Sequence, residues 1–485
     1  MVAMRAPPTN AGERPPAPRP SPALVKRVTE VVGPKGVITD AADMDAYLAD
    51  TRGLYRGASP LVVRPATTQE VAAVLRLCAE DGVPIVPQGG NTGLSGGAVA
   101  AGEVLLNLGR MNRVRAVDPL DHSITVEAGA VLADIQRVAE ERDRFFPLSL
   151  GAEGSCQIGG NLSTNAGGTA VLRYGSMREL TLGLEVVLPD GRVWDGLRGL
   201  RKDNTGYDLK HLFIGAEGTL GVITAAVLKL FPRPGLRHTA LVGLDEPDQA
   251  LELLARARAA SADALTAFEL FSRRCLDFAL DYVDGTIDPL DGKFAWYALI
   301  EFSAGTGVTG LGDALESILA DALEAGLISD AAIAQSEAQR SQMWFVREAL
   351  VEAQRHAGAS IKNDVAVPVS KVPQFIREAE AAVEALCPGI RPVAFGHAGD
   401  GNIHFNLTQP EVMDRQAFLD RWWELAGRVD EIAHEMNGSF SAEHGVGLLK
   451  RREMLRFKSP VELDLMRRLK AALDPGNLMN PGKVL

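Results

Sequence analysis

Three loops in the first half of the chain, residues 87–97, 151–169 and 203–221, are rich in Gly, Asn, Ser and Thr. Backbone N–H groups in such loops form concave nests for anions, and the polar side chains add hydrogen-bond donors. Their glycines let the backbone approach a ligand where a Cβ would collide. Three such loops together predict a fold built around a large, phosphate-bearing ligand.

Two common phosphate-binding folds are excluded by the same loops. No Gly-Lys-Ser/Thr sequence occurs, so none of the loops is a P-loop. None follows the strand–GxGxxG–helix pattern with an acidic residue about 20 positions later, so a dinucleotide-binding Rossmann fold is not supported.

Length and composition indicate a globular protein of two or three domains. The chain has 485 residues, of which 46% are hydrophobic and 23% charged. The net charge of −12, without a basic tract, argues against a nucleic-acid partner. No run of about 18 apolar residues occurs, so no membrane span is expected.

Cysteine usage and the N-terminus favour a cytoplasmic location. The four cysteines are widely scattered and form no CxxC motif, which predicts reduced, buried thiols. Residues 1–22 are rich in Pro, Ala and Arg and lack an apolar segment, so we expect a disordered tail and no secretory signal.

Hydrophobic periodicity predicts strands and helices in both halves of the chain. Thr67 to Glu70 opens a helix in the manner of a capping box, and Pro189-Asp190-Gly191 predicts a β-hairpin. After Pro232-Arg233-Pro234 the chain becomes rich in Ala, Leu and Glu, which indicates a linker and then a second α+β domain. In that domain we expect helices over 246–260, 309–326, 332–357 and 371–386, and strands near 265–270, 295–301, 393–395 and 403–407.

Two short segments of the second half, 395–406 and 441–447, concentrate metal-binding residue types. They carry His397, His404 and His444, three of only 8 histidines, together with Glu443. Two imidazoles and a carboxylate can hold a divalent metal with open positions, and a fourth group beside them can move a proton. The spacing predicts that a turn presents His397 and a strand presents His404. From these residues alone, a flavin-free metal hydrolase remains open.

The glycine loops resemble those of the vanillyl-alcohol-oxidase type of FAD-binding domain, at 87–97, at 159–168 with Tyr174-Gly175 after it, and at 215–221. The resemblance extends from about residue 25 to 485. Some members attach the flavin through a histidine at the place of Asn91, so the resemblance implies non-covalent FAD. It places the cofactor at Pro87, Gln88, Gly89, Gly90, Asn91, Thr92, Gly93, Leu94, Gly151, Gly159, Gly160, Asn161, Ser163, Thr164, Asn165, Gly168, Gly218, Gly221, Val222 and Asn480.

The fold that this resemblance implies is α+β. A two-subdomain FAD-binding domain is expected over 23–236, after the tail at 1–22. An α+β substrate domain with an antiparallel sheet follows over 237–450. We expect the C-terminal segment, 451–485, to pack back on the FAD-binding domain.

The second-half segments resemble the signature of the D-2-hydroxyacid dehydrogenase branch of this family, which includes D-2-hydroxyglutarate, D-lactate and glycolate dehydrogenases. The resemblance implies that His397, His404 and Glu443 bind zinc or manganese. It makes His444 the general base and a substrate contact, and Asn406 a second substrate contact. Oxidation of an α-hydroxy acid removes the hydroxyl proton and moves the Cα hydride to flavin N5, which suits a metal, a neutral imidazole and a flavin.

Arg347 and Lys362 bear on the choice of substrate. In the family, an arginine at the first position clamps the substrate carboxylate, and a lysine at the second holds the distal carboxylate of D-2-hydroxyglutarate. Val351 stands where the hydroxyglutarate enzymes have a threonine that reaches substrate. That change removes a hydrogen bond of about 1 kcal/mol, so D-malate and other D-2-hydroxy acids remain open.

The resulting prediction is FAD-dependent oxidation of D-2-hydroxyglutarate to 2-oxoglutarate by a homodimer. Electrons are expected to pass to an electron-transfer flavoprotein or a quinone. The alternatives within the family are a D-lactate, D-malate or glycolate dehydrogenase, an oxidase that uses O₂, and a flavoenzyme similar to alkyl-ether-lipid synthases. A non-catalytic flavin-binding subunit is a further alternative.

Overall fold

The computed structural model describes residues 18–485, which form two compact units. The first contains the described residues up to Gly167, then Ser176–Pro232 and Glu443–Leu485. The second contains Gly168–Gly175 and Arg233–Ala442. The unit boundaries therefore lie near 232 and 442, against the boundaries of 236 and 450 that we expect from the sequence. Most of the expected N-terminal tail, residues 1–17, lies outside the described residues.

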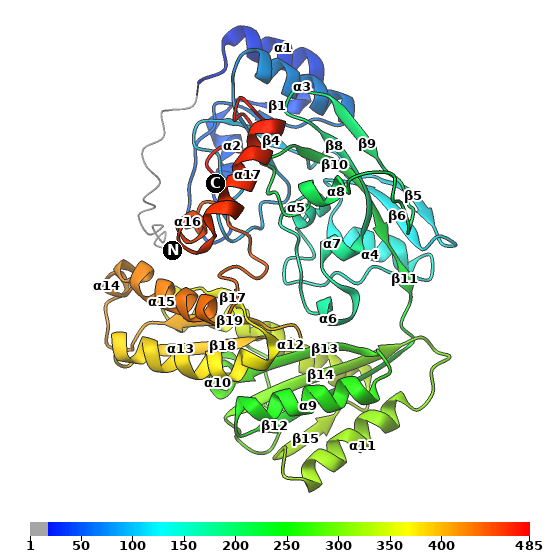
Figure 1. The fold of residues 1–485 in the computed structure, drawn as a ribbon, viewed down its shortest axis with the longest axis vertical. Helices are drawn as coiled ribbons and strands as arrows, with labels where there is room; N and C mark the ends of the chain where they lie inside the picture. Colours follow the sequence, from blue (N-terminus) through cyan, green and yellow to red (C-terminus); the bar gives the residue numbers. More distant parts are fainter. Residues whose placement is uncertain (1–17) are drawn as a thin grey trace. The chain divides into compact units, whose positions relative to one another are not determined.

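The first unit contains a small mixed sheet and a larger antiparallel sheet (Figure 1). In the small sheet β2 and β3 both run parallel to β4, and β1 is antiparallel to β2. The strands of this sheet are, in spatial order, β1 (Val37–Ile38), β2 (Val62–Val63), β4 (Val104–Asn107) and β3 (Ile85–Gln88). Those of the larger sheet are β5 (Val114–Asp118), β6 (Ser123–Glu127), β10 (Val222–Lys229), β8 (Thr181–Val187) and β9 (Val193–Gly196).

Helices cover the small sheet and form several of the connections between strands in the first unit. The Thr67 side chain accepts from the Glu70 amide and so caps α3, as expected. The expected capping box is not closed, because Glu70 accepts from the amide of Ala66, one residue before the N-cap. The remaining strands, β7 (Arg144–Phe145) and β11 (Phe231–Pro232), pair with each other. The helices are α1 (Pro22–Val32), α2 (Ala41–Leu48), α3 (Thr68–Glu80), α4 (Leu132–Glu140), α5 (Ile158–Ser163), α7 (Met177–Leu180), α8 (Lys210–Phe213), α16 (Arg451–Phe457) and α17 (Pro460–Leu473), with a 3₁₀ turn at Pro34–Gly36.

The second unit is built on one antiparallel sheet of eight strands. In spatial order they are β15 (Asp330–Ile333), β12 (Leu236–Leu244), β14 (Trp296–Ala304), β13 (Leu265–Ser272), β18 (Arg391–His397), β19 (Asn402–Thr408) and β16 (Ser360–Ile361), with β17 (Asp364–Ala366) also paired to β19. This arrangement confirms the expected α+β domain with an antiparallel sheet.

Helices cover both faces of this sheet, as Figure 1 shows for α9 and α13 on the near face and α12 behind. Phe375 of α13 packs edge-on against Phe405 of β19, while Arg347 of α12 reaches Glu269 on the other face. The helices are α6 (Val171–Tyr174), α9 (Pro247–Ala260), α10 (Arg273–Tyr282), α11 (Leu311–Glu324), α12 (Glu337–Ala353), α13 (Val372–Leu386), α14 (Arg415–Asp420) and α15 (Trp422–Glu435), with a 3₁₀ turn at Val369–Lys371.

Two expectations about the second unit were wrong in detail. The helix expected over 332–357 begins only at Glu337, because Asp330–Ile333 pairs as an edge strand with β12. His397 is not presented by a turn: it is the last residue of β18 and pairs with Asn402 across the hairpin. The elements β12, β16, β17, α6, α10, α14 and α15 were not predicted from the sequence.

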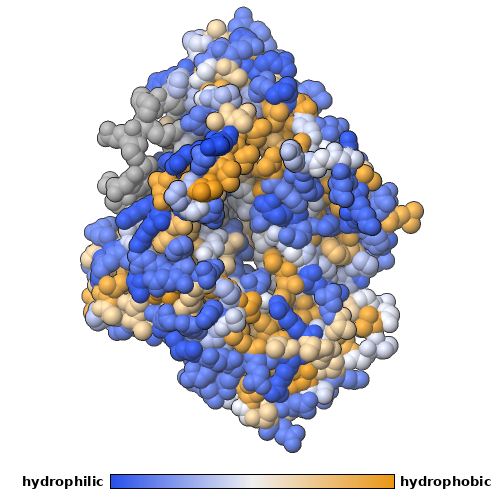
Figure 2. Space-filling model, viewed as in Figure 1, coloured by the Kyte–Doolittle hydropathy of each residue, from blue (hydrophilic) through white to orange (hydrophobic). Residues whose placement is uncertain are grey.

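The C-terminal helix α17 has one inner and one outer apolar side. Leu463 is buried, whereas Val461, Leu465 and Leu469 are 68%, 54% and 42% exposed and lie four residues apart. Figure 2 shows hydrophobic residues gathered over this helix. The outer row therefore adds little to the core, and α17 is held by its inner side.

The described part of the chain contains no helix with the length and apolar character needed to cross a bilayer. All four cysteines are free and buried, as expected.

Candidate active site

The three glycine loops meet in the first unit at positions where a side chain could not fit. A Cβ on Gly90 would lie 2.2 Å from the Ser155 carbonyl oxygen, so the first loop packs directly on the second. Gly218 has φ +70°, and a Cβ there would lie 3.1 Å from Cγ of Pro87, so the third loop packs on the first. These glycines allow the backbones of the three loops to pack directly against one another.

Hydrogen bonds from the side chains of Gln88 and Asn480 hold the converging loops together. The Gln88 amide nitrogen donates to the carbonyls of Tyr47 and Ala98, and its oxygen accepts from Asn107, so this side chain supports the loop. The Asn480 amide donates to the carbonyls of Gly97 at 2.9 Å and Glu217 at 2.7 Å. Asn480 thereby joins the C-terminal segment to the first and third loops.

Three buried acceptors at these loops have no partner among the described residues: Oε1 of Gln157 and Oδ1 of Asn161 and Asn480. A buried amide oxygen without a donor costs about 1–3 kcal/mol, so a ligand that supplies donors is expected here. The flavin ring N–H and the ribityl and ribose hydroxyls of FAD are such donors. The residues present therefore fit FAD, and two of the three, Asn161 and Asn480, were predicted to contact it.

Other predicted cofactor residues have local structural partners. The hydroxyls of Ser163 and Thr164 donate to the carbonyls of Gly159 and Gly160 one turn earlier. Asn91 and Asn165 have φ values of 53° and 50°, a conformation that asparagine tolerates better than most residues. Their remaining roles as cofactor contacts stay predictions, as do those of Gly89, Thr92, Gly93, Leu94, Gly151, Gly168, Gly221 and Val222.

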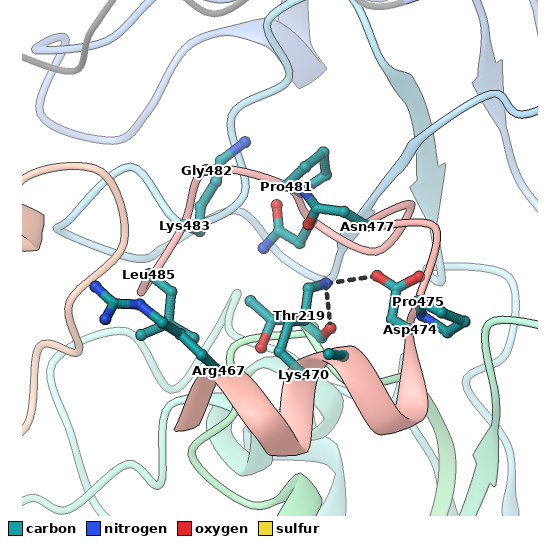
Figure 3. A pocket seen from close by; sticks show the side chains of 12 residues that line it. Thr219, Arg467, Lys470, Asp474, Pro475, Asn477, Pro481, Gly482, Lys483 and Leu485 are labelled. Carbon is teal, nitrogen blue, oxygen red and sulfur yellow. Dashed lines mark hydrogen bonds and ion pairs between the residues drawn. The ribbon is translucent and has the colours of Figure 1, made fainter. Parts of the chain in front are cut away.

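A cavity of about 270 Å³ is lined by α17 and the C-terminal segment (Figure 3). Lys470 extends into it and donates to the carbonyls of Thr219 and Met479, both at 2.7 Å, and to Asp474. These bonds tie α17 to the third glycine loop. The cavity lies beside Asn480, but no predicted catalytic residue lines it.

In the second unit, one face of the β18–β19 hairpin carries three of the residues predicted for the metal and substrate sites, His397, His404 and Asn406. Phe395 pairs with His404 and His397 with Asn402, so all four point to the same face. Asn406 follows His404 by two positions and shares that face. The His397 and His404 rings stand 5.5 Å apart, edge to face.

Glu269 of β13, which was not predicted from the sequence, holds both His397 and Arg347. Its carboxylate is 2.6 Å from His397 Nδ1 through Oε1 and accepts from Arg347 Nε at 2.7 Å through Oε2. Burial alone would raise the pKa of Glu269, but the charges and hydrogen bonds of His397 and Arg347 lower it to about 2. The Arg347 guanidinium also lies over the Phe395 ring, 5.0 Å from its centroid.

Asp364 of β17, also missed, lies beside His404. It is fully buried, pairs with His404 across the strands, and places Oδ1 3.7 Å from His404 Nδ1. Asn402 donates to the same oxygen at 3.0 Å. The Asp364 carbonyl accepts from the amide of Ala442 at 3.2 Å, so the chain brings Glu443 to this place.

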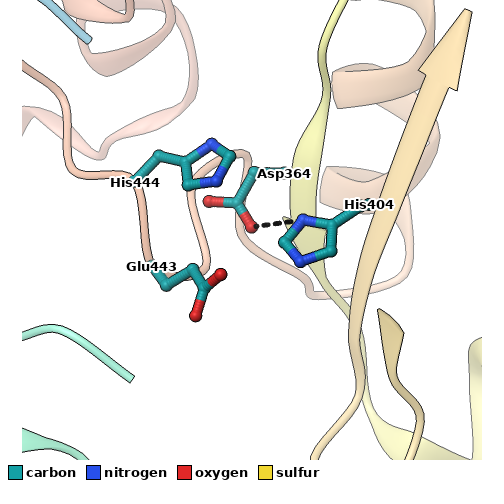
Figure 4. Close-up of side chains that lie close together, drawn as sticks. All are labelled: Asp364, His404, Glu443 and His444. Carbon is teal, nitrogen blue, oxygen red and sulfur yellow. Dashed lines mark ion pairs between the residues drawn. The ribbon is translucent and has the colours of Figure 1, made fainter. Parts of the chain in front are cut away.

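Asp364, His404, Glu443 and His444 form a possible metal-binding group (Figure 4). Each offers one ligand atom, and these atoms lie within 4.8 Å of one another. Imidazole nitrogens and carboxylate oxygens are the donors of catalytic zinc sites and also suit manganese. The residues present therefore fit a divalent metal. His404 and Glu443 were predicted as ligands, whereas His397 lies outside this group and Asp364 and His444 lie within it.

The loop that carries His444 is anchored to the glycine loops of the first unit. Glu217 accepts from the amides of Val446 at 2.7 Å and Gly447 at 2.9 Å. The Ser95 hydroxyl donates to the carbonyls of His444 and Gly445. Burial raises the pKa of Glu217, and the two amides oppose that rise. The position of the His444 backbone is therefore set by two of the loops predicted to hold FAD.

Lys362 and Asn406, the other two predicted substrate contacts, converge on one buried residue. The Gln354 side-chain oxygen accepts from Lys362 Nζ, and from Asn406 Nδ2 at 2.9 Å. Val351, which lies one helical turn before Gln354, is 49% exposed. Gln354 has no motif around it, so the sequence offered no signal for it.

Comparisons with known proteins agree with this arrangement. Residues 59–196 match the family described as "FAD binding domain", and residues 233–484 match "FAD linked oxidases, C-terminal domain". Both halves of the chain thus correspond to parts of one class of flavoprotein.

Individual relatives cover nearly the whole chain. D-2-hydroxyglutarate dehydrogenase of Stutzerimonas stutzeri is 38% identical over 96% of this chain and 99% of that protein. The mitochondrial D-2-hydroxyglutarate dehydrogenase of Arabidopsis thaliana is 38% identical over 94% of this chain and 80% of its own length. The crystal structure of p-cresol methylhydroxylase with substrate bound superimposes with a TM-score of 0.74 at 17% identity, over 95% of this chain and 96% of that one.

The chain belongs to the FAD-linked oxidase family, in the group that contains these D-2-hydroxyglutarate dehydrogenases. This membership confirms the family that the motifs predicted, the α+β fold of its FAD-binding domain, and FAD as cofactor. The predicted metal, the individual site residues and the electron acceptor stay predictions.

Proposed function

We propose that this protein oxidises D-2-hydroxyglutarate to 2-oxoglutarate with FAD and a divalent metal, zinc or manganese. One observation carries the proposal: the sheet face that bears His404 and Asp364 also has two cationic side chains, Arg347 and Lys362, on the segments around it. A metal-binding donor set beside two cations suits a hydroxy acid with two carboxylates.

The residues divide the chemistry among them. A bound flavin would supply the acceptor for the Cα hydride, and a bound metal would lower the pKa of the substrate hydroxyl. His444, as a neutral imidazole, accepts the hydroxyl proton near pH 7. The substrate thereby loses two electrons and two protons in becoming the 2-oxo acid.

Arg347 and Lys362 orient the substrate by its two ends. Arg347 uses Nε for Glu269, so its Nη groups are the donors for the carboxylate next to the reacting carbon. Lys362 holds the distal carboxylate, and Asn406 adds a neutral hydrogen bond. His397, fixed by Glu269, either completes the metal site or orients His404 beside it.

Electrons leave to an electron-transfer flavoprotein or a quinone, and the protein acts as a homodimer.

We place the protein in the cytoplasm, although the Arabidopsis relative carries a mitochondrial name. We assign FAD binding to residues 23–236, and binding of the substrate and the metal to residues 237–450.

A panel of D- and L-2-hydroxy acids with dye reduction as the readout tests the proposal. D-2-hydroxyglutarate is expected to give the highest kcat/KM, with no turnover of its L-enantiomer. Preference for D-lactate, D-malate or glycolate would replace the substrate assignment. Peroxide release in air would identify an oxidase, and a purified protein without flavin absorbance would refute the reaction altogether.

A further inference from the structure

We propose that Gln354 is a specificity-determining residue that holds Lys362 and Asn406 in place for a second substrate carboxylate. The proposal rests on the function proposed above and names the residue that builds the distal end of that site. Gln354 follows the last residue of α12 and is only 1% exposed.

The orientation of the Gln354 amide is fixed by its partners. Nε2 donates to the Leu350 carbonyl at 2.7 Å, while Oε1 accepts from Lys362 Nζ and Asn406 Nδ2. A flipped amide would set a donor against an ammonium and another donor, so this assignment is the one the bonds allow. One oxygen therefore serves as a common anchor for the two side chains.

The anchor of Lys362 is a neutral amide, so it adds no charge at the distal end of the site. A lysine side chain loses rotamer entropy when it is fixed, and a hydrogen bond to Gln354 offsets part of that loss before substrate binds. A carboxylate at this position would fix Lys362 equally well but would neutralise its ammonium. The amide orders the cation without adding a negative charge of its own.

Gln354 also links the cation to the strand of the predicted metal ligand. Asn406 lies two residues after His404 on β19, and its Oδ1 accepts from the Asn363 amide at 3.2 Å. Gln354 lies seven residues after Arg347, about two turns along the same side of the helix. The Val351 side chain between them cannot form hydrogen bonds, so Gln354 supplies the polar side chain at this end of the helix.

The test compares Gln354→Leu with Gln354→Glu, using substrates with one and two carboxylates. Gln354→Leu is expected to lower kcat/KM for D-2-hydroxyglutarate about tenfold, equal to about 1.4 kcal/mol, mainly through KM. Turnover of D-lactate should change less than about twofold on the same scale. Gln354→Glu should impair D-2-hydroxyglutarate more strongly, because it neutralises Lys362.

Two further measurements separate a specificity role from a structural one. In a Lys362→Met background, Gln354→Leu should lower kcat/KM by clearly less than in the wild type, because only Asn406 is left to lose its anchor. Dissociation constants for 2-oxoglutarate and pyruvate, from the change in flavin absorbance, should show the same selectivity without turnover. The matched control is Gln342→Leu, at a half-buried residue of α12 whose amide donates to the Gly285 carbonyl instead, which should keep the wild-type selectivity.

Equal losses for one- and two-carboxylate ligands, or no loss for either, would overturn the proposal. So would an additive effect in the Lys362→Met background. These outcomes differ from failure of the proposed function, in which the wild type itself oxidises no D-2-hydroxy acid.

Discussion

Glu217 holds the backbone of Val446 by a hydrogen bond of 2.7 Å, and its second oxygen accepts from Gly447. The two segments are more than 220 residues apart in sequence. Glu217 belongs to the third glycine loop, and Val446 follows His444 by two residues. A buried carboxylate of a predicted flavin loop therefore fixes the loop of the proposed base.

Replacing Glu217 by Gln is expected to lower kcat while FAD remains bound. The amide of glutamine can accept only one of the two hydrogen bonds, and an unpaired buried amide costs about 1–3 kcal/mol. If the His444 loop moves so that the unpaired amide finds another partner, the base is displaced and kcat falls about tenfold or more. Dye-reduction kinetics and the flavin absorbance of the same sample measure both effects.

Glu316→Gln is the control, because Glu316 is an exposed residue of α11. Normal kcat in Glu217→Gln would show that this anchor does not set the position of the base.

Replacing His404 by Ala is expected to remove the metal and abolish turnover, with FAD still bound. His404 belongs both to the predicted ligand set and to the group of four donors around Asp364. Metal content by mass spectrometry, together with flavin absorbance, reports the two cofactors separately. Exhaustive chelation of the wild type should give the same result.

The corresponding control is His356→Ala, an exposed histidine near Glu352. Full activity of a metal-free wild-type preparation would contradict the metal role. Metal content of His397→Ala decides whether His397 is a ligand as well.

Glu269 makes the protein less stable in acid. Its pKa is about 2 in the folded protein, against an ordinary value of 4.5. A lowered folded pKa adds stability above the unfolded value and loses it as pH falls from about 4.5 toward about 2. Wild type should therefore lose stability across this range, and Glu269→Gln should lack that part of the loss. Urea unfolding between pH 5 and 3 tests this, and parallel curves for the two proteins would refute it.

The four cysteines should resist alkylation in the native protein. All are buried, and burial raises the pKa of Cys78 to about 12 and of Cys275 to about 11, so little thiolate forms at pH 8. Mass spectrometry after iodoacetamide treatment should find no label on the native protein and four labels after denaturation. Rapid native labelling would show that one of these thiols becomes accessible.

The predicted elements that depend on local signals are largely correct. Thr67 caps α3, and Pro189-Asp190-Gly191 joins β8 to β9 as a hairpin. Local propensity failed at Asp330–Ile333, where the helical periodicity of the segment gave way to pairing with β12. Pairing with a distant strand is a tertiary interaction that no local window contains.

The sequence by itself determined the cofactor class and most of the candidate site, because glycine loops and closely spaced histidines are local patterns. Only the tertiary structure decided which other side chains contact these histidines and the predicted substrate residues. Asp364 reaches His404 through strand register, Glu269 reaches His397 and Arg347 across neighbouring elements, and Gln354 meets Lys362 and Asn406 at a helix end. These partners are buried single residues without a motif, and long-range packing alone selects them.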